Sequence, residues 1–130
     1  MELESIATGF YKSAFSKTTD VDLGSLLEKL GIRSTKRNKI LERVRRENVT
    51  EMILESIANL DSDSYTMKTD IPENPDIKSL LGICIGVEEN RFKFFTQSSA
   101  KIGFLIEAAD TFERLADENK DNIVTLKKMF

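Results

Sequence analysis

Apolar residues recur at helical spacing along most of this 130-residue chain, and both prolines fall within one segment, residues 61–76. Apolar side chains at i, i+3, i+4 and i+7 are the pattern of an amphipathic helix, whereas a proline interrupts a helix. The pattern predicts helices over residues 3–16, from Asp20 to Leu30, from Thr35 onward and over 98–116, with a short last helix from Asp121. The loop 61–76 then divides two helical halves of a single domain, residues 1–130.

Two further helix boundaries are expected in the first half. Gly31 suits the left-handed position after a helix, and Ser34 can cap the next helix. At about 100° per residue, the apolar residues of 40–44 and those of 49–60 point roughly 150° apart. We therefore expect a break near Asn48 as well.

Residues 80–95 fit two structures. Leu80, Leu81 and Cys84 have the spacing of a buried helix, whereas residues 81–87 also alternate as a strand that could turn back at residues 88–91. We expect a mostly α fold, a compact bundle of five or six helices, with a β-hairpin near residues 80–95 as the alternative to a helix there.

The composition argues against an enzyme. The chain has no histidine, which removes the commonest general base and the commonest transition-metal ligand. Its one cysteine, Cys84, lies among apolar residues that raise a thiol pKa, so we expect it to be buried and structural. No glycine-rich phosphate-binding loop occurs. We predict no catalytic residues, no metal site and no cofactor.

The sequence also predicts a cytoplasmic protein with no membrane contact. Its longest apolar run, Leu80–Val87, is too short to cross a bilayer, and its first four residues include two glutamates where a secretory signal is basic.

Positive charge is concentrated in one segment. Residues 33–46 contain seven Lys or Arg and one Glu, a net charge of +6, so a total of −3 leaves −9 for the remainder. We expect this segment to form the outward face of a short third helix and to meet a negatively charged partner. The candidate binding residues are Arg33, Lys36, Arg37, Lys39, Arg43 and Arg46. The plainer alternative is a solvated basic face.

Residues 23–44 resemble the helix-turn-helix of small transcription regulators. The likeness lies in a helix, the turn Leu30-Gly31-Ile32 and a following basic helix that carries Ile40. The resemblance implies that Thr35, Lys36 and Asn38 face bases in the major groove, and that the protein binds as a dimer.

Two functions follow from these observations. The first is a non-enzymatic protein-binding module, such as an adaptor, inhibitor or small assembly subunit, whose basic helix docks on the acidic surface of another protein. Three phenylalanines within four residues, Phe92, Phe94 and Phe95, are its expected aromatic contacts, because one helix cannot bury all three on one side. The alternative is a regulator that binds double-stranded DNA through residues 23–46, as a homodimer.

Overall fold

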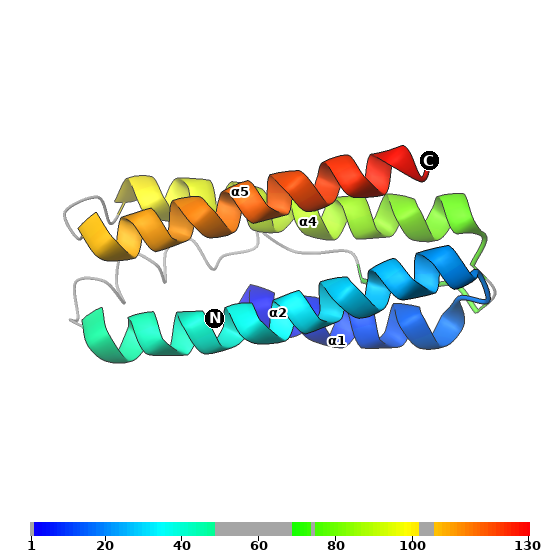
Figure 1. The fold of residues 1–130 in the computed structure, drawn as a ribbon, viewed down its shortest axis with the longest axis horizontal. Coiled ribbons are helices and arrows are strands. Elements are labelled where there is room, and N and C mark those ends of the chain that lie inside the picture. The colour runs from blue at the N-terminus through cyan, green and yellow to red at the C-terminus, as the bar shows by residue number, and fades with distance from the viewer. Residues whose placement is uncertain (1, 49–68, 74, 102–105) are drawn as a thin grey trace.

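The protein is a bundle of long helices (Figure 1). The computed structural model describes residues 2–48, 69–73, 75–101 and 106–130, and the side chains at 2, 3 and 45–48 lie outside that description. The described residues form four helices and no strand: α1 (Glu2–Lys17), α2 (Val21–Asn48), α4 (Ile77–Lys101) and α5 (Ile106–Lys128). The mostly α prediction is confirmed.

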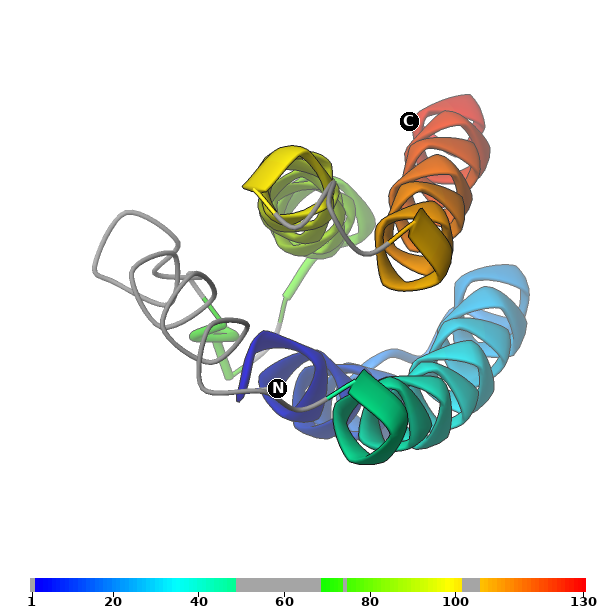
Figure 2. The same ribbon diagram turned by 90° about the vertical axis from the view of Figure 1, so that its left-hand side faces the viewer.

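The four helices form two antiparallel hairpins that face each other. Figure 1 shows a tight turn between α1 and α2 at one end of the bundle, whereas α4 ends and α5 begins at the opposite end. Seen along the bundle axis, α1 lies beside α4 and α2 beside α5 (Figure 2). Helices α2 and α4 run in the same direction.

Two apolar clusters lie at different levels along the bundle axis. One joins the start of α4 to the α1–α2 turn end and includes Tyr11, Leu27 and Cys84, all buried. The other lies at the opposite end and includes Phe95 and Phe112. Each of α2, α4 and α5 carries buried polar residues between its contributions to the two clusters. The hydrophobic core is therefore interrupted halfway along the bundle by a polar layer.

The predicted turn at Gly31 is wrong. Helix α2 runs without interruption from Val21 to Asn48, and no glycine among the described residues has a positive φ. A Cβ at Gly31 would meet Tyr11 Cβ at 3.6 Å, so this glycine lies against α1 inside a continuous helix. The sequence predicted a local helix stop at Gly31, but in the structure α2 continues and packs against α1 at this glycine.

The hairpin, kept as the alternative to a helix, is wrong. Residues 80–95 lie within α4, and the predicted helix starts near Ser98 and at Asp121 fall inside α4 and α5. The described residues form four helices, whereas five or six were expected for the whole chain. Residues 49–60 and most of the loop 61–76 lie outside the described residues. The boundary at Asp20 is confirmed, because its Oδ1 accepts a hydrogen bond from the Leu23 backbone N–H at 2.8 Å.

Among the described helices, none combines the length and the apolarity that crossing a membrane requires.

Candidate functional site

The predicted basic residues divide between the surface and the interior. Lys36, Lys39 and Arg43 are exposed on α2. Arg33 is also exposed, but its Nη1 donates a hydrogen bond to Asn122 Oδ1 of α5 at 2.7 Å. We call Lys36, Lys39 and Arg43 the α2 basic face. The side chain of Arg46 lies outside the described residues.

Arg37 does not belong to the predicted surface. Its side chain is only 2% exposed, although its neighbours in the sequence point outward. It lies on the same side of α2 as the buried Leu41 and Val44, and groups on other helices compensate its charge. The prediction that Arg37 faces solvent is therefore wrong.

The predicted aromatic contacts are mostly internal. Phe94 and Phe95 are fully buried, and the Phe95 ring makes an edge-on contact with Phe112, with centroids 5.5 Å apart. Only Phe92 is partly exposed. Helix α4 buries both Phe94 and Phe95 because it packs against α5 on one side and against the α1–α2 hairpin on the other. Phe94 and Phe95 are thus corrected from contact residues to core residues.

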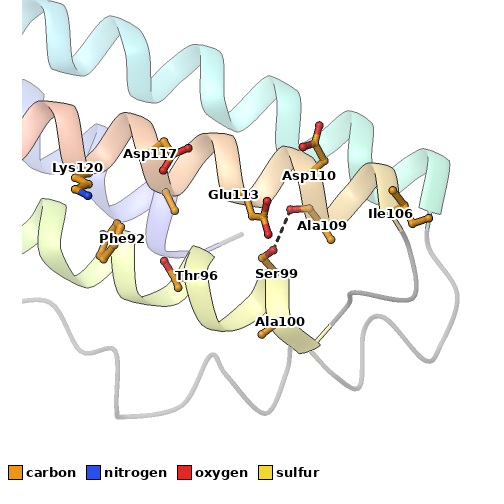
Figure 3. A pocket seen from close by; sticks show the side chains of 11 residues that line it. Phe92, Thr96, Ser99, Ala100, Ile106, Ala109, Asp110, Glu113, Asp117 and Lys120 are labelled. Carbon is orange, nitrogen blue, oxygen red and sulfur yellow. Dashed lines mark hydrogen bonds between the residues drawn. The ribbon is translucent and has the colours of Figure 1, made fainter.

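Phe92 lines an open groove between α4 and α5 (Figure 3). The floor is made of small side chains such as Ser99 and Ala109, and the Ser99 hydroxyl donates to the Ala109 carbonyl at 3.1 Å. Asp110, Glu113 and Asp117 give the α5 side a negative charge, and Ile106 is 81% exposed at one end. The groove combines exposed apolar surface with acidic side chains.

The most unusual chemistry lies in the polar layer at the bundle centre. We call its seven members, each at most 2% exposed, the polar core: Glu4, Ser34, Arg37, Glu88, Arg91, Asn119 and Asn122. Every helix contributes to it, with Glu4 on α1, two residues on each of α2 and α5, and Glu88 and Arg91 on α4. Burying a charge is costly unless the charge is paired, so these contacts define the site.

Arg91 joins the two hairpins through their glutamates. Its Nη1 lies 2.5 Å from Glu4 Oε1, and its Nη2 donates a hydrogen bond to Glu88 Oε1. The same Glu4 oxygen accepts a hydrogen bond from Ser34 Oγ at 2.9 Å. The guanidinium also lies over the ring of Tyr11, 5.8 Å from its centroid. One cation thereby bridges two buried carboxylates from different hairpins.

Arg37 makes a second connection between the hairpins. Its Nη2 donates to Asn119 Oδ1 at 2.7 Å, and its Nε lies 3.1 Å from Glu4 Oε1 as an ion pair without hydrogen-bond geometry. Its guanidinium lies over Phe95, 5.1 Å from the ring centroid. Nη1 reaches toward the partly exposed Glu118 at 3.5 Å.

Glu88 accepts hydrogen bonds from three other members of the polar core, of which Arg91 is one, and from Tyr11. Its Oε1 also accepts the Tyr11 hydroxyl at 2.5 Å, and its Oε2 accepts the side-chain amides of Asn119 at 2.6 Å and Asn122 at 3.4 Å. These donors come from α1, α4 and α5, so Glu88 ties three helices together. The two glutamates and two arginines balance in formal charge.

The electrostatics follow from burial and from these pairs. Burial lowers the pKa of Arg91, but Glu88 and Glu4 raise it more, so its pKa lies above the ordinary value. Burial lowers the pKa of Arg37 against the opposing effect of Glu4. Burial and the neighbouring Glu88 raise the pKa of Tyr11, which therefore stays a neutral donor. Arginine remains protonated in proteins, so the polar core holds two permanent cations.

Among the described residues, no three His, Cys, Asp or Glu side chains come together. Cys84 is buried, and burial raises the pKa of its thiol to about 12, which disfavours a reactive thiolate. The burial predicted for Cys84 is confirmed.

Sequence reasoning missed most of the polar core. A visible indication was Arg37, which shares a side of α2 with Ile40 and Val44, and Glu88 and Arg91 interrupt the apolar pattern of α4 in the same way. A charged residue at a position where the helical pattern expects a buried apolar residue indicates a buried ion pair when a second helix shows the same feature. This indication can be used only if both helices are known to be continuous.

Comparisons of this chain with protein families, with curated proteins and with solved structures give no significant match.

Proposed function

We propose that this protein is a non-enzymatic binding module that docks an acidic partner protein on the α2 basic face. The observation that carries this proposal is the exposed positive charge at Lys36, Lys39 and Arg43. Within the described part of the chain, no carboxylate lies within 4.0 Å of these three side chains.

Exposed cations without a local partner favour long-range attraction. Such charges steer a partner of opposite sign and raise its association rate, and salt screens the effect. By comparison, the exposed Arg114 is already paired with Asp110 at 3.0 Å. The α2 basic face thus offers charge that an acidic surface can neutralise.

The bundle interior supports a role at the surface. Helical bundles that bind cofactors do so with side chains that project into the core. Here the corresponding level is occupied by Glu88 paired with Arg91, and by Arg37, which donates to Asn119 and lies beside Glu4.

The DNA-binding interpretation loses its structural basis. A helix-turn-helix needs two helices at an angle, and α2 is one continuous helix across Gly31. The experiment below therefore tests duplex DNA as an alternative partner.

The experiment reverses the charge of the proposed face and compares it with a matched control. Lys36→Glu, Lys39→Glu and Arg43→Glu are combined in one variant. The control, Lys93→Glu, Lys127→Glu and Lys128→Glu, makes the same change in net charge at exposed positions on α4 and α5. Cross-linked partners of tagged protein in extracts of the native host are quantified by mass spectrometry, with nuclease treatment, at two salt concentrations.

The proposal predicts acidic protein partners that the α2 variant loses and the control retains, with weaker capture at high salt. Equal capture by both variants would contradict it. The protein could instead bind a duplex oligonucleotide in a salt-dependent way, with only the α2 variant losing this binding. That result would show that the partner of the α2 basic face is nucleic acid and not protein. Sedimentation of the purified protein shows whether a second copy occupies the face instead.

A further inference from the structure

A small groove lies between α1 and α2, and we call it the α1–α2 groove. Its volume is about 210 Å³, below the range of about 300–1,000 Å³ that small-molecule sites occupy. Tyr11, Leu27 and Gly31 line it, and Gly31 adds no side chain that would fill it. Ile32, which also lines it, lies nine residues from the buried Leu41 and therefore about 180° around α2. The groove thus faces away from the α4–α5 hairpin.

Two half-exposed apolar side chains flank the α1–α2 groove. Phe15 of α1 is 46% exposed and Ile32 of α2 is 51% exposed, and both line the groove. Exposed apolar surface with a polar rim is typical of a site that binds another protein. Lys12 and Glu28 supply one charge of each sign to the rim, so the groove has no net charge of its own. Its size and chemistry fit one large apolar side chain of a partner.

The α1–α2 groove and the α2 basic face lie on the same side of α2. At about 100° per residue, all three members of the α2 basic face lie within about 40° of Ile32 around the helix. All of these side chains are exposed. Glu42 is the only carboxylate among the exposed residues of 35–43, so three cations and one anion leave this stretch a net charge of +2. An apolar site is therefore followed along α2 by a row of positive charge.

We propose that the partner binds the α2 basic face through an acidic amphipathic helix that places one large apolar side chain in the α1–α2 groove. This inference rests on the proposed function and adds the chemistry of the partner. Burial of the apolar side chain supplies affinity, and the acidic residues set the orientation of the helix and speed its association. The partner thus needs both an apolar anchor and a row of carboxylates.

The spacing of the site favours a helix over an extended segment. Lys36, Lys39 and Arg43 lie 4, 7 and 11 residues beyond Ile32, which is about 6, 10.5 and 16.5 Å along the axis of α2. A helix packed alongside has the same rise per residue, so carboxylates 4, 7 and 11 residues from its anchor would meet the three cations. An extended segment gains affinity by pairing with the edge of a sheet, whereas α1 and α2 pair their backbone groups internally.

The test uses two synthetic helical peptides as probes. Each is an alanine-based helix of about 20 residues, long enough to be partly helical in water. Each carries one leucine and three glutamates spaced 4, 7 and 11 residues from it, to match the α2 basic face. The glutamates follow the leucine in one peptide and precede it in the other, so that both helix directions are covered. Control peptides replace the leucine with serine, or the glutamates with glutamine.

Binding is measured by titrating each peptide into ¹⁵N-labelled protein and following the amide chemical shifts, which both locate the contact and detect weak affinity. Phe15→Ser/Ile32→Ser removes the apolar walls of the groove. Ile77→Ser/Val124→Ser is the matched control, because it removes side chains of similar exposure, 43% and 49%, from α4 and α5. Circular dichroism checks that each variant is folded, and the serine control peptide tests the anchor on the wild type itself.

At least one leucine peptide should shift the signals of Gly31 and Ile32 together with those of the α2 basic face. Replacing the leucine, or the groove walls, with serine should weaken binding about tenfold or more. Ile77→Ser/Val124→Ser should leave the affinity unchanged, and glutamine peptides should bind more weakly and without salt dependence.

Three results would overturn the inference. If leucine and serine peptides bind equally and only the α2 basic face responds, the anchor is wrong and the docking function stands. If no peptide binds the wild type, an acidic amphipathic helix is wrong, and the capture of partners from the host decides the docking function separately. Binding of a leucine peptide that persists in the α2 variant would contradict the inference and the docking function together.

Discussion

Replacing Gly31 with alanine tests whether α2 is continuous at the position where the sequence predicted a turn. In a helix interior, alanine is more favourable than glycine by about 1 kcal/mol. The new Cβ would lie 3.6 Å from Tyr11 Cβ, an ordinary van der Waals contact that adds no strain. We therefore expect the free energy of unfolding to rise by about 1 kcal/mol, which for a chain of this size raises the transition temperature by about 4 °C.

The alternative geometry predicts the opposite sign. In a helix-turn-helix, Gly31 would adopt the left-handed conformation, where a Cβ costs about 1–2 kcal/mol. Urea unfolding followed by far-ultraviolet circular dichroism measures the difference. Gly82→Ala is the matched control, because Gly82 lies inside α4 and a Cβ at this position would have nothing within 4 Å. A stabilised Gly82→Ala together with a Gly31→Ala that loses about 1 kcal/mol or more would refute a continuous α2.

Three other outcomes follow from burial and pKa. Phe94→Ala should lower the free energy of unfolding by about 3–5 kcal/mol. Phe92→Ala should lower it by only about 1–2 kcal/mol, because its ring is partly exposed. Equal losses of free energy would contradict the burial of Phe94 and the partial exposure of Phe92. Cys84 should not react with a thiol reagent at a pH of about 8, near the ordinary thiol pKa, until the protein unfolds, and rapid reaction of the native protein would show that it is accessible. Stability to urea should fall as the pH rises from about 9 toward 12, because the raised pKa values of Cys84 and Tyr11 make the folded protein keep protons that the unfolded chain releases. Cys84→Ala should reduce this fall, and an unchanged pH profile would contradict the cause.

Periodicity and local capping predicted the helical class well. Residues 3–16 were predicted as a helix and lie within α1, and Asp20 caps α2 as expected. These features depend on neighbours within one turn of helix, which a sequence displays directly. The same holds for Cys84, whose apolar neighbours indicated burial.

The errors arose where distant residues decide the outcome. Gly31 and Ser34 have the local chemistry of a turn, but Gly31 packs on α1 and Ser34 donates to Glu4, 30 residues away. Arg37 was expected outside as a member of the basic segment 33–46, yet Asn119, 82 residues away, accepts its hydrogen bond. Only the assembled bundle brings these partners together.

The most direct test of the polar core is the coupling between Arg91 and Glu4, which join the two hairpins. Breaking a buried ion pair from either side costs about 3–5 kcal/mol, because it strands the remaining charge. A double-mutant cycle with Arg91→Met and Glu4→Gln is measured by urea unfolding. Each single substitution should lower the free energy of unfolding strongly, and the double substitution should lower it by much less than the sum of the two. Single losses under about 1 kcal/mol, or losses that simply add, would show that these side chains do not hold the centre of the bundle together.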